Sequence, residues 1–177
     1  MGVTIHFEGK LQSQNSYQKL IDTAKKFAVS NDLTFSLFEE ENKFLERVKD
    51  ETDWNYQGPT KGILIQPDKN SDPLNIEFDT DLYIQEFCKT QFAGPGVHIL
   101  IIDLLRQIEP YFEHLTVNDE AEYWETKDMA ILQKHIDACF EAIEEAKQED
   151  KSLEGPFRLN TGRIIDLMPV DKDKNDA

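Results

Sequence analysis

The sequence lacks any apolar run near the roughly 20 residues that a membrane-spanning helix needs. Its first ten residues also lack the basic region followed by a hydrophobic region that marks a secretory signal. We therefore expect a soluble protein without a membrane segment, and a cytoplasmic location by default.

Cysteine is scarce, since only Cys88 and Cys139 occur in 177 residues and no CxxC pair is present. Both lie among apolar neighbours, where cysteine usually behaves as a small buried hydrophobe. The sequence predicts two buried free thiols, and nothing in it supports a disulfide between them.

Basic residues are outnumbered, with 19 Lys and Arg against 35 Asp and Glu and a formal net charge of -16. Such an excess repels phosphate backbones and anionic lipid, and it attracts cationic molecules. The charge therefore argues against nucleic-acid and membrane binding, and it favours a basic protein partner.

Bulky apolar residues are plentiful, because 11 Phe, 5 Tyr and 2 Trp stand within a hydrophobic share of 39%. This composition is too apolar for a disordered chain and suits one packed core at this length. We predict a single α+β domain over residues 1–147, an extension docked on it over 148–170, and a disordered tail over 171–177.

The pattern at the start of the chain predicts a strand, a helix and a second strand. Apolar residues alternate from Val3 to Phe7, fall at helical spacing after a predicted N-cap at Ser16, and alternate again from Leu33 to Leu37. Periodicity then fades over 39–60, a stretch rich in acids. Gly62–Gln66 and Leu74–Phe78 flank a Pro- and Asp-rich turn, which predicts a hairpin.

The second half of the chain predicts a buried helix, a strand and a last helix. Apolar positions from Val97 to Phe112 hold helical spacing after Gly94-Pro95-Gly96, and Leu115 and Val117 alternate. Tyr123 and Trp124 are expected to extend the sheet, and a helix is expected from Thr126 or Asp128 to about Lys147. We predict a largely antiparallel sheet with helices packed on one face, ferredoxin-like with an inserted acidic segment. The alternative is a larger sheet to which residues 39–60 contribute a strand.

The first acidic cluster follows the predicted hairpin and contains Glu77, Asp79, Asp81 and Glu86. Carboxylates spaced one residue apart at a strand end can share a hard cation such as Mg²⁺ or Ca²⁺, which makes Glu77, Asp79 and Asp81 a candidate metal site. The alternative, which we favour, is that these acids are solvated and cap a following helix.

The second acidic cluster surrounds two aromatic residues and contains Asp119, Glu120, Glu122, Glu125 and Asp128. Aromatic side chains beside carboxylates suit a docking surface for a cationic partner or a carbohydrate pocket. We assign partner binding to Asp119, Glu120, Glu122, Tyr123 and Trp124, with solvated acids on a sheet strand as the alternative.

Other catalytic signatures are weak. The four histidines lie in different predicted elements, and the P-loop, GxGxxG, HExxH and GxSxG patterns do not occur. A dyad of Cys88 and His98 is geometrically conceivable around the glycine turn, although a buried cysteine is the better interpretation.

These observations predict a non-catalytic binding module for a basic protein partner, comparable in its chemistry to an immunity protein or an acidic adaptor, with no cofactor. The competing hypothesis is a metal-assisted hydrolase that uses Glu77, Asp79 and Asp81, with Glu122 or His98 completing the site.

Overall fold

The computed structural model describes residues 2–170, so the predicted disordered tail lies outside the described residues. Its helices are α1 (Gln14–Ser30), α2 (Pro95–Ile108), α3 (Tyr123–Thr126) and α4 (Met129–Glu149), with a 3-10 turn, η1 (Glu109–Tyr111), after α2. The six longer strands are β1 (Thr4–Leu11), β2 (Thr34–Leu45), β5 (Tyr56–Gln66), β6 (Leu74–Phe78), β7 (Tyr83–Lys89) and β8 (Phe112–Asp119). The pairs of two-residue strands are β3 (Val48–Lys49) with β4 (Thr52–Asp53), β9 (Leu153–Glu154) with β12 (Met168–Pro169), and β10 (Phe157–Arg158) with β11 (Ile164–Ile165). The predicted α+β class is confirmed.

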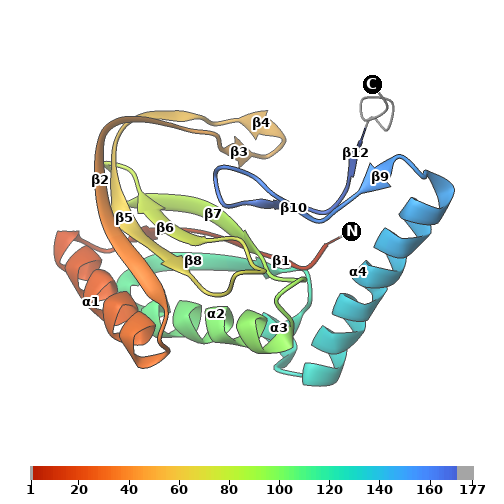
Figure 1. Cartoon of the computed structure of the whole chain (residues 1–177). Coiled ribbons are helices and arrows are strands. Elements are labelled where there is room, and N and C mark those ends of the chain that lie inside the picture. The colour runs from red at the N-terminus through yellow and green to blue at the C-terminus, as the bar shows by residue number, and fades with distance from the viewer. Residues whose placement is uncertain (1, 171–177) are drawn as a thin grey trace.

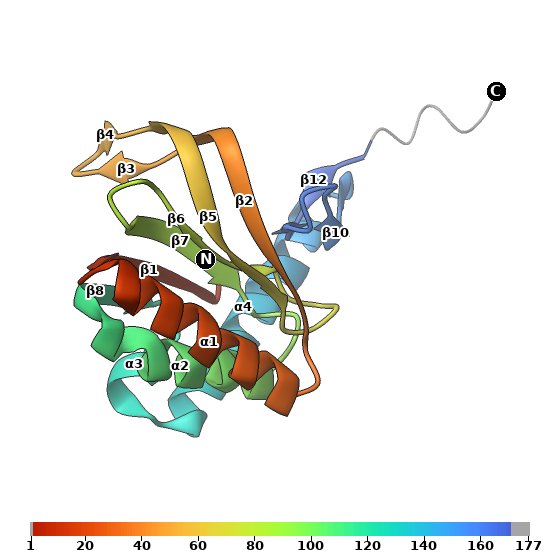
Figure 2. The same cartoon turned by 90° about the vertical axis from the view of Figure 1, so that its left-hand side faces the viewer.

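The longer strands form two antiparallel sheets of order β2-β5-β6 and β7-β1-β8. A tight turn over residues 79–82 joins β6 to β7, which run side by side as the two sheets splay apart (Figures 1 and 2). A ferredoxin-like arrangement is not confirmed, because β1 is antiparallel to both of its neighbours and a βαβ unit requires a parallel pair. Residues 39–45 and 56–60 instead extend β2 and β5, as in the alternative topology.

The helices α1 and α2 pack together against one face of the strands (Figure 2). Alternation along each strand turns one set of side chains toward these helices and the other set away. The core therefore combines strand residues Ile5, Phe7, Ile63, Ile76 and Phe78 with helix residues Leu20, Ile101, Leu104 and Leu105. The opposite set, including His6 and Glu8, faces a groove.

A second, smaller core lies where α4 meets the start of the chain. Val3 and Ala121 pack there against Leu132, Ile136 and Cys139 of α4. Tyr123 contacts both cores, so α3 links α4 to the main body. Among residues 2–170, no helix combines the length and hydropathy that crossing a bilayer requires.

The expected helix after Asp81 is wrong, because residues 83–89 form strand β7. Asp79 accounts for the difference: its carboxylate accepts the backbone N–H groups of Asp81 and Tyr83 at 2.8 and 3.0 Å. These two bonds close a turn that sends the chain back along β6 instead of into a helix.

The predicted start of α1 and the expected strand at Tyr123 and Trp124 are also wrong. Ser13, not Ser16, caps α1, since its hydroxyl accepts the N–H of Ser16 at 3.1 Å. Tyr123 and Trp124 begin the short helix α3, because the Asp119 carboxylate accepts the N–H groups of Ala121 and Trp124 and curls the chain at the end of β8.

The close pairing of β5 with β6 predicts a sharp difference between two glycine variants. A Cβ on Gly62 would lie 1.9 Å from the Ile76 carbonyl oxygen, whereas a Cβ on Gly96 would meet nothing within 4 Å. We expect Gly62→Ala to lower the free energy of unfolding by about 3 kcal/mol or more, since backbone atoms must move. Gly96→Ala, in the first turn of α2, should raise it by up to about 1 kcal/mol. Chemical denaturation of both variants checks this, and equal stability would contradict the register.

Candidate functional site

A groove of about 1210 Å³ lies on the strand face opposite α1 and α2. Strands β1, β6 and β7 form its floor, and residues 43–55 and 161–163 form two of its walls (Figure 1). The charged side chains that line it are Glu8, Lys43, Glu46, Arg47, Asp53, Glu77, Glu86 and Arg163. We call this cavity the groove.

Glu77 lies in the floor on β6 and is only 1% exposed. Lys43 of β2 donates to both of its carboxylate oxygens at 2.8 Å, and Thr60 and Asn75 donate at 2.6 and 2.9 Å. A buried carboxylate is tolerated only when it is paired in this way. Glu77 therefore fixes the end of β2 against the floor.

Glu86 lies beside Glu77 on β7 and shares the donor Asn75, whose Nδ2 is 3.1 Å from Glu86. Burial raises the pKa of Glu86, while the nearby Arg163, 3.0 Å away, opposes that rise. Arg163 also donates to the Phe87 carbonyl and to Asp72, and its guanidinium stacks 4.0 Å from the Phe87 ring centroid. These contacts dock residues 157–165 at the edge of the groove.

Arg47 forms the third cation pair of the groove and is only 3% exposed. Its Nη1 donates to Asp79 at 2.7 Å and its Nη2 to the Tyr83 carbonyl at 3.2 Å. The rings of Trp54, Tyr56 and Tyr83 surround the guanidinium, with centroids 5.9, 5.4 and 5.1 Å from its carbon. Arg47, directly before the small β3–β4 hairpin, thus helps to anchor it to the body.

Glu8 differs from the other floor acids because its partners are neutral. Tyr83 and Gln85 donate to it at 2.7 and 2.9 Å, and no ion pair among residues 2–170 includes it. Burial and the hydrogen bond to Glu8 raise the pKa of Tyr83, so its hydroxyl stays a donor at neutral pH. Glu46 and Asp53 lie in the wall formed by residues 43–55, and they likewise take part in none of the described ion pairs. The groove consequently carries excess negative charge.

The residues of the predicted metal site do not converge on one point. Glu77 faces Lys43, Asp79 faces Arg47, and Asp81 is exposed at the turn. Within residues 2–170, no group of three His, Cys, Asp or Glu side chains is arranged to hold a metal ion. The favoured solvated interpretation also fails for Glu77 and Asp79, which are buried ion-pair members.

Each of the first three acids in the second cluster meets a histidine. Asp119 lies 3.1 Å from His98, Glu120 lies 3.6 Å from His6, and Glu122 lies 2.7 Å from His135. Asp119 is buried and has no surface to offer a partner, whereas Glu120 and Glu122 are exposed.

The two aromatic residues of that cluster are partly covered. Tyr123 packs against both cores, and the guanidinium of Arg106 lies 3.3 Å from the Trp124 ring centroid. Arg106 also donates to the Trp124 carbonyl at 2.6 Å. Trp124 is therefore held by the protein itself rather than presented as a free anchor.

Thr90, His98 and Asp119 form a chain that resembles a catalytic triad in composition. Thr90 Oγ1 lies 2.8 Å from His98 Nδ1, and His98 Nε2 lies 3.1 Å from Asp119. The side chains of His98 and Asp119 are fully buried, so no substrate reaches them. This hydrogen-bonded series of side chains connects the end of β7 and helix α2 to the end of β8. Its role is therefore structural.

The conceivable Cys88–His98 dyad is not formed, because the Cys88 thiol donates to the Asp72 carbonyl and His98 is already paired. Burial raises the pKa of Cys88, which keeps it an unreactive thiol. Cys139 is also buried, and no disulfide joins the two cysteines.

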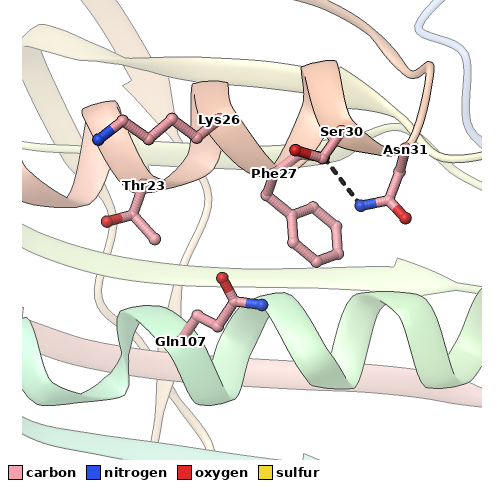
Figure 3. A pocket seen from close by; sticks show the side chains of 6 residues that line it. All are labelled: Thr23, Lys26, Phe27, Ser30, Asn31 and Gln107. Carbon is pink, nitrogen blue, oxygen red and sulfur yellow. Dashed lines mark hydrogen bonds between the residues drawn. The ribbon is translucent and has the colours of Figure 1, made fainter.

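A second hollow of about 300 Å³ lies between α1 and α2 (Figure 3). Phe27 points from α1 toward α2 there, and Asn31 Nδ2 donates to the Phe27 carbonyl at 2.9 Å to close the end of α1. The other lining groups are Thr23, Lys26, Ser30 and Gln107. These residues shape a helix crossing and offer no convergent charged groups.

Sequence reasoning missed Glu8, Lys43, Arg47 and Arg163 as site residues. A signal existed for two of them, because Lys43 and Arg47 are among the few cations in the acid-rich stretch 39–60. Glu8 and Arg163 carry no comparable signal, since only the sheet register and the docked C-terminal segment bring them to the groove.

Compared with models of protein families, with curated protein sequences and with solved structures, the chain gives no match. Its function must therefore be argued from the groove and its charges.

The buried Asp119 predicts a defined pH dependence of stability. Burial alone would raise the pKa of Asp119, but His98 and the N–H groups of Ala121 and Trp124 lower it below its usual 3.8. A lowered pKa in the folded state stabilises the protein above pH 3.8, and this contribution is lost as the pH falls through the lower folded-state value.

We expect Asp119→Asn to be less stable than the parent by about 1.5–3 kcal/mol at pH 7, with the difference shrinking as the pH falls below 3.8. Urea denaturation at several pH values measures it. A difference that stays constant over this range would contradict the assignment.

Proposed function

We propose that this protein is a non-catalytic binding module that holds a basic segment of a protein partner in the groove. The observation that carries the proposal is the charge balance of the groove. Its cations Lys43, Arg47 and Arg163 are each matched by a buried acid: Glu77, Asp79 and Asp72. Glu8, Glu46 and Asp53 are not matched, so the groove presents negative charge to whatever enters it.

The net charge of the whole chain supports the same partner chemistry. An acidic protein of net charge -16 attracts a cationic molecule over long range and speeds its encounter. Immunity proteins that neutralise basic toxins and acidic adaptors both use this principle, and the proposal covers either.

Exposed apolar side chains beside the groove supply short-range affinity. Phe44 is 54% exposed and Phe87 is 41% exposed, and both line the groove. Aromatic anchors next to complementary charge are typical of the residues that dominate binding energy. The proposal thus moves the centre of docking from Trp124 to the groove, and it keeps Glu120 and Glu122 as outer acidic contacts.

Neutralising the unmatched acids tests the proposal. The variant combines Glu8→Gln, Glu46→Gln and Asp53→Asn, and the probe is a peptide rich in lysine and arginine. We expect its Kd, measured by isothermal titration calorimetry, to rise about tenfold, equivalent to about 1.4 kcal/mol. Affinity of the parent should fall with salt, because ions screen exposed charges over about 8 Å at physiological strength.

The matched control removes the same charge from a distant surface. The control variant combines Glu141→Gln, Glu145→Gln and Glu149→Gln, which all lie on the exposed side of α4. We expect this variant to change the Kd less than about twofold. Equal weakening by both triple variants would show that only net charge matters, and it would refute the groove as the binding site.

A further inference from the structure

The environment of Arg47 has the composition of a receptor for an arginine side chain. Trp54, Tyr56 and Tyr83 surround its guanidinium, and Asp79 and the Tyr83 carbonyl accept its two terminal nitrogens. We call the set Trp54, Tyr56, Tyr83 and Asp79 the cage. Cationic groups bind well to aromatic faces, and a planar fork with two acceptors selects guanidinium over ammonium.

The fit of Arg47 in the cage is incomplete. Its Nε is buried and has no hydrogen-bond partner among residues 2–170. A buried donor without an acceptor is a penalty for the folded state. An arginine entering from the groove would keep its Nε on the groove side and still place its two terminal nitrogens on Asp79 and the Tyr83 carbonyl.

The segment that carries Arg47 has few other attachments to the body. Strands β3 and β4 have two residues each, and the turn between them places Asp50 and Glu51 at φ of 50° and 64°, where non-glycine residues are rare. Val48 exchanges two hydrogen bonds with the Gln85 side chain. Val48 and Trp54 nevertheless remain exposed. The contacts of Arg47 with Asp79, the Tyr83 carbonyl and the three rings are therefore the main interactions that an incoming ligand must replace.

Arg47 connects the cage to the proposed binding groove. Arg47 itself lines the groove, together with Asp53 and Asn55 of the wall formed by residues 43–55. The hydroxyl of Tyr83, a cage residue, donates to Glu8, one of the three unmatched acids of the groove. A basic segment lying in the groove would thus present its side chains to the position that Arg47 fills.

We propose that the cage is a binding site for an arginine of the partner, and that Arg47 occupies it in the unbound protein. The incoming guanidinium displaces Arg47 and takes over the Asp79 carboxylate and the Tyr83 carbonyl. This inference rests on the proposed function in one respect: the arginine is part of the basic segment that the groove binds. It specifies that the partner must carry arginine and that lysine does not replace it.

The direct test empties the cage and offers it a small guanidinium. The variant is Arg47→Ala in a Trp124→Phe background, which leaves Trp54 as the one tryptophan of the chain. The probes are methylguanidinium chloride and methylammonium chloride at equal ionic strength. We expect methylguanidinium to raise the Tm and change Trp54 fluorescence in a saturable way. Methylammonium should do neither.

Two control variants isolate the cage. The Trp124→Phe protein with Arg47 intact should respond only at about tenfold higher methylguanidinium concentration, because Arg47 competes for the cage. Arg47→Ala combined with Asp79→Asn should not respond, because the anionic acceptor is gone. A folded Arg47→Ala variant that ignores methylguanidinium would overturn the inference, as would an equal response to methylammonium. If Arg47→Ala does not fold, recovery of its circular dichroism with methylguanidinium supports the inference, and failure to recover overturns it.

A second arm tests displacement in the intact cage. Two peptides of identical length and charge, one with arginine and one with lysine, are titrated against the parent and the folded Arg47→Ala variant. We expect the arginine peptide to bind the variant about tenfold more tightly than the parent, because the parent site is occupied most of the time. The lysine peptide should gain much less. Equal affinities for both proteins would show that Arg47 does not compete with the ligand.

The two proposals fail in different ways. The groove fails if removing its acids and removing the acids of α4 weaken peptide binding equally. The cage fails if Arg47→Ala does not distinguish methylguanidinium from methylammonium, whatever the groove variants do.

Discussion

Three buried carboxylates and one largely buried carboxylate at and around β6 constrain how the rest of the chain is arranged. Asp72 precedes the strand, Glu77 lies on it, Asp79 follows it, and Glu86 lies on the neighbouring β7. Each needs donors in a place that water hardly reaches. The cationic donors come from outside the β6–β7 turn region: Lys43 to Glu77, Arg47 to Asp79, and Arg163 to both Glu86 and Asp72.

These pairs determine position more than net stability. A buried ion pair adds little over an apolar contact, but loss of one partner costs about 3–5 kcal/mol because a charge is left unmatched. The wall formed by residues 43–55 and the docked segment 157–165 are therefore held where their cations meet the acids. The groove is the space left between them, and its unmatched acids are what a cationic ligand can use.

Short-range sequence patterns correctly predicted those helices and strands whose formation depends on neighbouring residues. The β5–β6 hairpin follows from turn formers between two alternating runs, and α2 follows from helical spacing after Gly94-Pro95-Gly96. The first site prediction identified Glu77 and Asp79 as unusual but assigned them to metal or solvent. Their true partners lie 34 and 32 residues away, and the partner of Glu86 lies 77 residues away, so no local spacing shows them.

Tyr123 and Trp124 show the same limit at shorter range. Alternating aromatic and acidic residues suit a strand, yet the buried Asp119 binds two backbone N–H groups and forces a helical turn. The burial of Asp119 depends in turn on His98, which reaches it from α2. A carboxylate that looks solvated in the sequence is here the group that decides local structure, because its partner is distant.

Mapping the binding site by nuclear magnetic resonance tests the central claim most directly. The claim is that unmatched acids in the groove, rather than the acidic surface as a whole, hold a basic ligand. An arginine-rich peptide added to isotope-labelled protein should shift the backbone amide signals of residues 6–8, 46–55 and 83–87. Shifts centred on residues 119–128, or spread evenly over the acidic surface, would contradict the account.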